Sequence, residues 1–290
     1  MKNKTFTAMI LLAFAGTALA APLWAQTEAD FQVAVTQDGQ GVRILRYTGT
    51  IMDVVIPATI QGMPVREIAP ETFRLADNRR MDITSVVIPE GVTLIEARLF
   101  SPGFERLASV TLPSTITSIG QGAFMNTPAL RSITLPEGLV EIGQQAFANS
   151  GITSITIPAS AYSIGDSAFA GSAITSITWH GRPGLIQVGM FNRCINLQTV
   201  VIPEGVSRIG DLAFAGCTAL TSVTLPSTIT SIYDSAFGGC TALTTVTIPE
   251  TIERIRFGSG AVGGDVFREC NQIPLATQAH LRRLGYTGVF

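Results

Sequence analysis

The chain has 290 residues, of which 46% are apolar and only 14% charged, a balance that excludes a chain disordered by excess charge. Without Lys2 and Lys4 no lysine remains, which excludes Schiff-base and Walker-A chemistry. The remaining 17 arginines (19 − 2) against 21 acidic residues leave a net charge of −4 (17 − 21), so the chain lacks the positive charge that binds nucleic acid or an anionic membrane. Two histidines, His180 and His280, are too few for most metal or acid–base sites, so we expect no enzyme activity and no cofactor.

The first 20 residues have the pattern of an export signal. Lys2 and Lys4 precede the apolar run Phe6–Leu19, and residues 18–20 form the small-x-small sequence that signal peptidases cut. A cut after Ala25 fits less well, and an uncleaved anchor is the other alternative, although about 14 apolar positions fall short of the about 20 that span a bilayer. We therefore expect export to the cell surface, periplasm or medium, with no transmembrane segment after signal removal.

Residues 27–50 follow the signal and precede the regular part of the chain. Within them Asp38-Gly39 is a turn signal of the kind that joins two antiparallel strands. This segment is therefore predicted to form an N-terminal hairpin cap.

Residues 51–270 contain a unit that recurs about nine times, each time as an apolar stretch that ends in proline or, once, in His180. From Pro89 onward the steps between these positions are 24, 23, 22, 22, 23, 23 and 23 residues. A phenylalanine follows each position by 11 residues, except that the outermost units take 16 and 18 residues to reach Phe73 and Phe267. A stacked array is expected to have end units that differ from the inner ones, because its ends face water. The prolines are Pro57, Pro89, Pro113, Pro136, Pro158, Pro203, Pro226 and Pro249.

The shared pattern is L-x-x-I-x-I-P-x-x-I-x-x-I-G-x-x-A-F-x-x-C, as in residues 220–240. Alternating apolar residues before the proline predict a short strand, residues 229–232 predict a second extended piece, and the A-F stretch predicts a turn or single helical turn. Burying about six side chains contributes roughly 10–18 kcal/mol, whereas ordering about 23 residues costs about 1–2 kcal/mol each. One unit cannot fold alone, so we predict a single elongated solenoid of stacked units.

This pattern resembles the BspA-type (treponemal) leucine-rich repeats of bacterial surface proteins. The match rests on Leu130–Pro136, on Ile142-Gly143 with Ala146-Phe147, and on the G-C-T-A-L runs at 216–220 and 239–243. It covers about residues 51–270. The resemblance implies a leucine-rich-repeat solenoid with a curved parallel-stranded sheet, surface display and attachment to host proteins or other cells. It implies no particular ligand and no catalytic residue.

Residues 271–290 complete the chain as a C-terminal cap. Leu275 to Leu284 has helical spacing, with the basic residues Arg282 and Arg283 near its end. A short C-terminal helix is therefore predicted.

Cys194, Cys217, Cys240 and Cys270 each lie three residues after a repeat phenylalanine. Thr127, Ser150 and Ser172 fill the same column in earlier units, which favours small buried residues and free thiols. Neighbouring units lie close enough for a disulfide, so a disulfide remains an alternative and a metal site a weaker one.

Gly258–Gly263 matches G-x-G-x-x-G, the dinucleotide-binding fingerprint. Arg283 stands about where that fingerprint needs an acidic residue, and the stretch coincides with extra residues of the last unit. We interpret it as a glycine-rich surface loop.

Trp179, His180 and Arg182 form the main departure from the repeat. Trp179 falls on the inward column of Ile157 and Ile202, so we favour a core role for it, with an exposed recognition loop at 179–182 as the alternative. A catalytic histidine is disfavoured because no nucleophile or orienting carboxylate can be placed beside it.

The outward positions of the predicted strands, four and two residues before each proline position, are mostly serine and threonine with almost no charge. They form either a solvated strand face or a polar platform that binds a protein or glycan by many weak contacts. We favour an exported binding protein, with a structural envelope component without a specific ligand as the alternative. The candidate ligand-binding residues are Thr111, Arg131, Thr134, Thr156, Thr178, Thr224, Thr247, His180 and Arg182.

Overall fold

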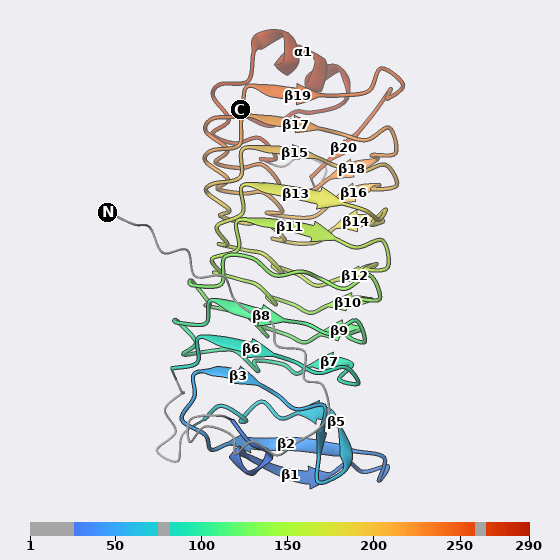
Figure 1. Cartoon of the computed structure of the whole chain (residues 1–290). Coiled ribbons are helices and arrows are strands. Elements are labelled where there is room, and N and C mark those ends of the chain that lie inside the picture. Colours follow the sequence, from blue (N-terminus) through green and yellow to red (C-terminus); the bar gives the residue numbers. More distant parts are fainter. Residues whose placement is uncertain (1–25, 75–81, 259–264) are drawn as a thin grey trace, which may run out of the picture.

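A computed structural model describes residues 26–74, 82–258 and 265–290. The chain forms one stack of rungs, with a sheet at the N-terminal end and a helix at the C-terminal end (Figure 1). The predicted parallel-stranded solenoid is confirmed. The predicted export signal and most of the Gly258–Gly263 motif lie outside the described residues.

The N-terminal cap begins with a short 3-10 helix, η1, and the hairpin predicted there is confirmed. Its two strands pair antiparallel, and the turn is fixed by a 2.6 Å hydrogen bond from the hydroxyl of Thr36 to Asp38 Oδ1 and by Gly39, whose φ of +69° suits glycine. The second strand also pairs in parallel with a later strand, so the cap sheet continues into the first repeat. These elements are η1 (Glu28–Asp30), β1 (Phe31–Val35), β2 (Val42–Tyr47), β4 (Thr59–Ile60) and β5 (Met63–Ile68).

One row of short parallel strands runs the length of the stack. Its members are β3 (Asp53–Val55), β6 (Ser85–Val87), β8 (Ser109–Thr111), β11 (Ser154–Ile157), β13 (Ser176–Trp179), β15 (Thr199–Val201), β17 (Ser222–Thr224) and β19 (Thr245–Thr247). They form the sheets β3-β6-β8, β11-β13 and β15-β17-β19 (Figure 1). Residues 131–136 occupy the equivalent place between β8 and β11 without strand pairing.

A second row of two-residue strands follows the proline turns, as the extended piece expected near residues 229–232 predicts. Its members are β7 (Leu94–Ile95), β9 (Ser118–Ile119), β10 (Glu141–Ile142), β12 (Ser163–Ile164), β14 (Leu185–Ile186), β16 (Arg208–Ile209), β18 (Ser231–Ile232) and β20 (Arg256–Phe257). They form two parallel sheets, β7-β9-β10-β12 and β14-β16-β18-β20. Every rung therefore has two sides, one for each row of strands.

The rung phenylalanines form a continuous stack through the core. From Phe100 to Phe267, neighbouring ring centroids lie 5.2–5.5 Å apart and the ring planes are within 15° of parallel. All these rings are fully buried. The 11-residue spacing from proline to phenylalanine thus places one aromatic ring at the equivalent position of each inner rung, so that successive rings stack along the axis of the solenoid.

The repeat phenylalanines lie in non-helical turns, so of the two conformations predicted for the A-F stretch the single helical turn is not formed. From Phe100 to Phe237 each turn uses left-handed backbone two residues before the phenylalanine, and most also two residues after it, as at Gln145 (φ 56°) and Asn149 (φ 55°) around Phe147. Glycine takes several of these positions, including Gly122 and Gly216, because it adopts positive φ without steric cost.

The last rung is covered by α1 (Leu275–Arg283), which confirms the predicted C-terminal helix (Figure 1). Leu281 and Tyr286 are buried there, and the Tyr286 ring packs edge-on against Phe267 with centroids 5.4 Å apart. The Tyr286 hydroxyl also accepts a hydrogen bond from the Phe267 amide. The final phenylalanine of the stack therefore does not face water.

The four cysteines are free and buried, which confirms the favoured prediction and rules out the disulfide alternative. Each thiol donates to the carbonyl oxygen of the phenylalanine in the preceding rung, as from Cys217 to Phe191 at 3.2 Å. Burial raises the pKa of Cys194 to about 11. The column therefore links neighbouring rungs and offers no reactive thiolate.

Candidate binding surface

We define the strand face as the residues that stand four and two positions before each proline position, on the outer side of the first strand row. Its inward neighbours, such as Ile155 and Val246, are buried. Parallel pairing brings equivalent residues opposite one another, with Thr156 beside Thr178 and Thr224 beside Thr247. Of the candidate threonines, Thr224 is half-buried. The other five are exposed, namely Thr111, Thr134, Thr156, Thr178 and Thr247. The structure thus aligns them on one face.

Valines interrupt the hydroxyl pattern of the strand face at three rungs. Val55, Val87 and Val201 occupy the position two before the proline, and their exposed fractions are 57%, 37% and 64%. The face is therefore a hydroxyl surface with apolar patches, rather than the nearly uniform hydroxyl surface expected. Among its residues only Asp53 is charged, and hydrogen bonds from the hydroxyls of Thr84 and then Ser85 hold its pKa below the usual value.

A separate row of threonines, five residues before the proline positions, links the rungs. The hydroxyl of Thr175 donates to the carbonyl of Thr153 at 3.1 Å, and that of Thr221 donates to Gln198 at 3.0 Å. By contrast, within the described residues the hydroxyls of the strand-face residues Thr111 to Thr247 make no hydrogen bond to the protein. Hydroxyls of the linking row are therefore used by the fold, and those of the strand face from Thr111 to Thr247 remain available to a ligand.

Arg131 also belongs to the linking row. Its carbonyl accepts the hydroxyl of Thr153 at 3.4 Å, while its side chain is exposed beside the strand face. It therefore borders the surface without being one of its outward strand residues.

Two of the glutamates that follow the prolines bind the next rung. Glu90 accepts the amide and hydroxyl of Ser114 at 3.0 and 3.1 Å, and Glu204 accepts those of Ser227 at 2.9 Å each. These bonds, the amide bond first, hold the pKa of each carboxyl below its usual value. Both glutamates therefore stabilise the stack.

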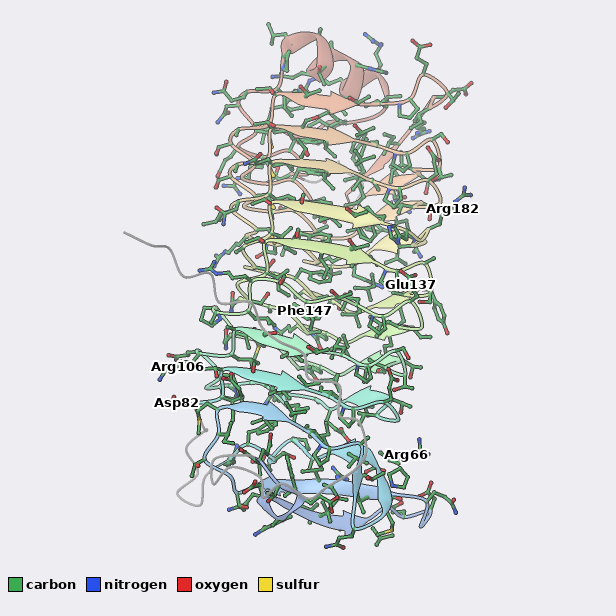
Figure 2. All side chains as sticks on the ribbon, viewed as in Figure 1. Arg66, Asp82, Arg106, Glu137, Phe147 and Arg182 are labelled. Atoms are coloured by element: carbon green, nitrogen blue, oxygen red, sulfur yellow. The ribbon has the colours of Figure 1, made fainter. Side chains whose placement is uncertain are left out.

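The 180–182 segment continues directly from β13 at the edge of the strand face. Both His180 and Arg182 are exposed, and His180 Nδ1 lies 3.9 Å from Glu137 Oε1. Figure 2 shows Glu137 and Arg182 at the same edge of the stack. Because Thr178 precedes this segment by two residues, the structure brings the two sets of candidate residues together on one continuous surface.

Trp179 points inward, as its column predicts. Its ring meets Phe191 edge-on with centroids 6.3 Å apart, and it stands opposite the buried Ile157. It is half-buried, and its buried Nε1 has no hydrogen-bond partner among the described residues. Trp179 therefore packs against the core rather than forming part of the exposed surface.

Neither a metal-binding cluster nor a membrane-spanning helix occurs in ranges 26–74, 82–258 and 265–290. Those ranges hold no group of three or more histidine, cysteine or acidic residues placed to bind a metal. Their helices are also too short and polar to cross a bilayer. The candidate surface is therefore described by its hydroxyls, valines and edge charges.

The sequence signature of the BspA type leucine rich repeat region matches residues 67–183 and 184–277 of the chain, in six copies. The chain is also similar to the crystal structure of the Treponema pallidum leucine-rich repeat protein, with 27% identity over 91% of this chain and 98% of the other and a TM-score of 0.44.

Two further solved structures are similar to the chain. A leucine-rich repeat protein from Bacteroides ovatus is 20% identical over 84% of this chain and 80% of its own, with a TM-score of 0.53. The pneumococcal vaccine antigen PcpA is 19% identical over 81% and 72%, with a TM-score of 0.49. No functionally curated protein matches the chain.

Proposed function

Because the chain belongs to the BspA-type leucine-rich repeat family, we propose that it is exported and binds a protein partner through its strand face, in attachment to host material or other cells. Support for export comes from the signal-like sequence of residues 1–20. Support for binding comes from the strand face itself. The proposal involves no catalysis.

The observation that carries this proposal is the division of hydroxyls between two rows. Thr153, Thr175 and Thr221 use their hydroxyls to bond the preceding rung. The strand-face threonines that lie three residues later, such as Thr156 and Thr178, are exposed, and within the described residues their hydroxyls make no hydrogen bond to the protein. A surface of aligned donors and acceptors is what an extended partner can match at each rung.

The composition of the strand face favours a protein over a glycan as the partner. Exposed valines such as Val87 and Val201 lie among the hydroxyls, and apolar patches surrounded by polar groups are typical of protein interfaces. Rungs repeat every about 4.8 Å, so a partner that lies along the stack meets many weak contacts in turn. Their combined effect supplies the affinity.

The test places negative charge on alternate rungs of the strand face through Thr134→Glu, Thr178→Glu and Thr224→Glu. Skipping a rung each time keeps the new carboxylates from lying directly opposite one another, which limits repulsion within the sheet. The control adds the same charge away from the face through Gln121→Glu, Asn196→Glu and Thr241→Glu, all at exposed positions. The immobilised proteins are exposed to host extracellular-matrix and cell-wall extracts.

We expect the wild type and the control variant to capture the same protein, and the strand-face variant to lose it. Circular dichroism and urea unfolding verify that both variants are folded. Equal capture by the two folded variants would contradict binding through the strand face. Capture that survives protease treatment of the extract would contradict a protein partner.

A further inference from the structure

The second strand row has a column of residues directly after each two-residue strand that is normally glycine. A Cβ added to Gly120 or Gly143 would lie 2.6–2.7 Å from the nearest backbone nitrogen of the preceding rung, and at Gly165 this distance is 2.4 Å. Contacts this short leave no room for a side chain. Over the three rungs of β9, β10 and β12 this column is therefore closed and smooth.

In the C-terminal half the same column changes character. Its residues there are Gln187, Gly210 and Tyr233, in three successive rungs. A glycine between two large side chains leaves a notch one rung wide, with Gly210 as its floor and Gln187 and Tyr233 as its walls. The walls stand two rung spacings apart, about 10 Å between backbones at about 4.8 Å per rung.

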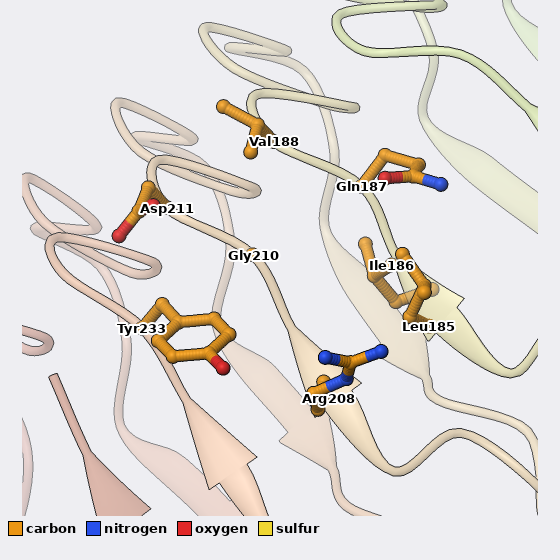
Figure 3. A pocket seen from close by; sticks show the side chains of 8 residues that line it. All are labelled: Leu185, Ile186, Gln187, Val188, Arg208, Gly210, Asp211 and Tyr233. Atoms are coloured by element: carbon orange, nitrogen blue, oxygen red, sulfur yellow. The ribbon is translucent and has the colours of Figure 1, made fainter. Parts of the chain in front are cut away.

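The notch is a cavity of about 220 Å³ with an aromatic wall and polar ends (Figure 3). The half-buried Tyr233 extends across it with its hydroxyl toward Arg208, while Asp211 lies at the other end of the ring. Leu185 and Val188 add apolar surface. Drug-sized ligands occupy about 300–1,000 Å³, so this cavity suits a single ring.

Most side-chain polar atoms of the notch are not used by the fold. Neither the guanidinium of Arg208 nor the amide of Gln187 makes a hydrogen bond or ion pair within the described residues. Asp211 accepts the Asp234 amide through Oδ1 at 2.9 Å, which leaves Oδ2 for another partner. One cation and one carboxylate balance, so the notch selects for a neutral ligand with both donors and acceptors.

We propose that this notch binds one neutral sugar ring. The C–H face of a pyranose is apolar and packs on an aromatic side chain, whereas its edge presents neighbouring hydroxyls that pair with the planar groups of arginine, aspartate and glutamine. Tyr233 supplies the platform, and Arg208, Asp211 and Gln187 supply the polar contacts. The site lies on the second strand row and is separate from the strand face, so the two proposals stand independently.

The experiment titrates the whole mature chain with the methyl glycosides of glucose, galactose, mannose and N-acetylglucosamine, by saturation-transfer-difference NMR and calorimetry. At least one glycoside is expected to bind, with transfer strongest to the protons of its C–H face. Tyr233→Gly restores the residue usual in this column and so preserves the fold. It should weaken binding about tenfold, the value of one aromatic contact.

Two further variants complete the test. Arg208→Gln should weaken the same glycoside, whereas Tyr162→Ala, which removes a tyrosine 76% exposed elsewhere on the stack, should leave binding unchanged. Binding of none of the four glycosides, or equal binding by Tyr233→Gly, would overturn the proposal. Preferential binding of acetate or glycine would also overturn it, by identifying the notch as a site for a charged ligand. The strand-face variant Thr134→Glu/Thr178→Glu/Thr224→Glu should bind the glycoside normally.

Discussion

Replacing Phe147 by alanine removes one ring from the middle of the aromatic stack (Figure 2). The ring is fully buried, lies 5.2 and 5.4 Å from the rings of Phe124 and Phe169, and is within 4° of parallel to both. The space cannot close readily, because 2.7 Å hydrogen bonds from the amides of Phe124 and Phe147 to the next rung fix the rung spacing. The expected loss in free energy of unfolding is therefore at the level of about 3–5 kcal/mol that buried phenylalanines show.

The assay is equilibrium unfolding in urea followed by circular dichroism, with the slope of the transition checked because repeat arrays can lose cooperativity. Tyr162→Ala in the neighbouring rung serves as the control, since this exposed ring should cost less than about 0.5 kcal/mol. A loss below about 1 kcal/mol for Phe147→Ala would show that this column is not the core of the stack.

Three more outcomes follow from the same contacts. Because the pKa values of Glu90 and Glu204 in the folded state lie below the usual value near 4.5, both residues stabilise the fold above that pH and lose this effect as the pH falls through the folded values. Urea titrations should therefore show that acid lowers the free energy of unfolding less in Glu90→Gln/Glu204→Gln than in the wild type. Leu212 is 45% exposed with φ of 57°, so Leu212→Gly should raise the free energy of unfolding by about 1 kcal/mol, and a decrease would contradict the strain. The buried thiol of Cys194, with its pKa raised to about 11, should resist iodoacetamide until urea unfolds the chain; rapid labelling of the native protein would refute its burial.

The repeat itself could be predicted from the sequence because its physical requirement is local. Proline, or His180 in one rung, follows each strand of the first row, and in the inner rungs the 11-residue spacing fixes the distance to the buried phenylalanine. Both strand rows and the aromatic stack therefore follow from one unit. The inward position of Trp179 follows from the same column assignment. The hairpin at Asp38-Gly39 and the helix from Leu275 are likewise local signals.

Contacts between rungs could not be predicted, because they join residues more than 20 positions apart whose alignment across the stack depends on how the rungs pack. The Glu90–Ser114 clasp is one example, and the donation from Cys217 to the Phe191 carbonyl, which occupies the thiol without a disulfide, is another. The notch at Gly210 is a third, since its walls come from rungs on either side. Val87 and Val201 are visible in the sequence, but only their exposure shows that they interrupt the hydroxyl surface.

Site-specific photocrosslinking tests binding through the strand face most directly. Benzoylphenylalanine placed at Thr156, on the strand face, should crosslink the captured protein, whereas the same group at Gln144, exposed beside the second strand row, should not. Crosslinking at Gln144 but not at Thr156, by folded proteins that capture the partner equally well, would contradict the proposed interface.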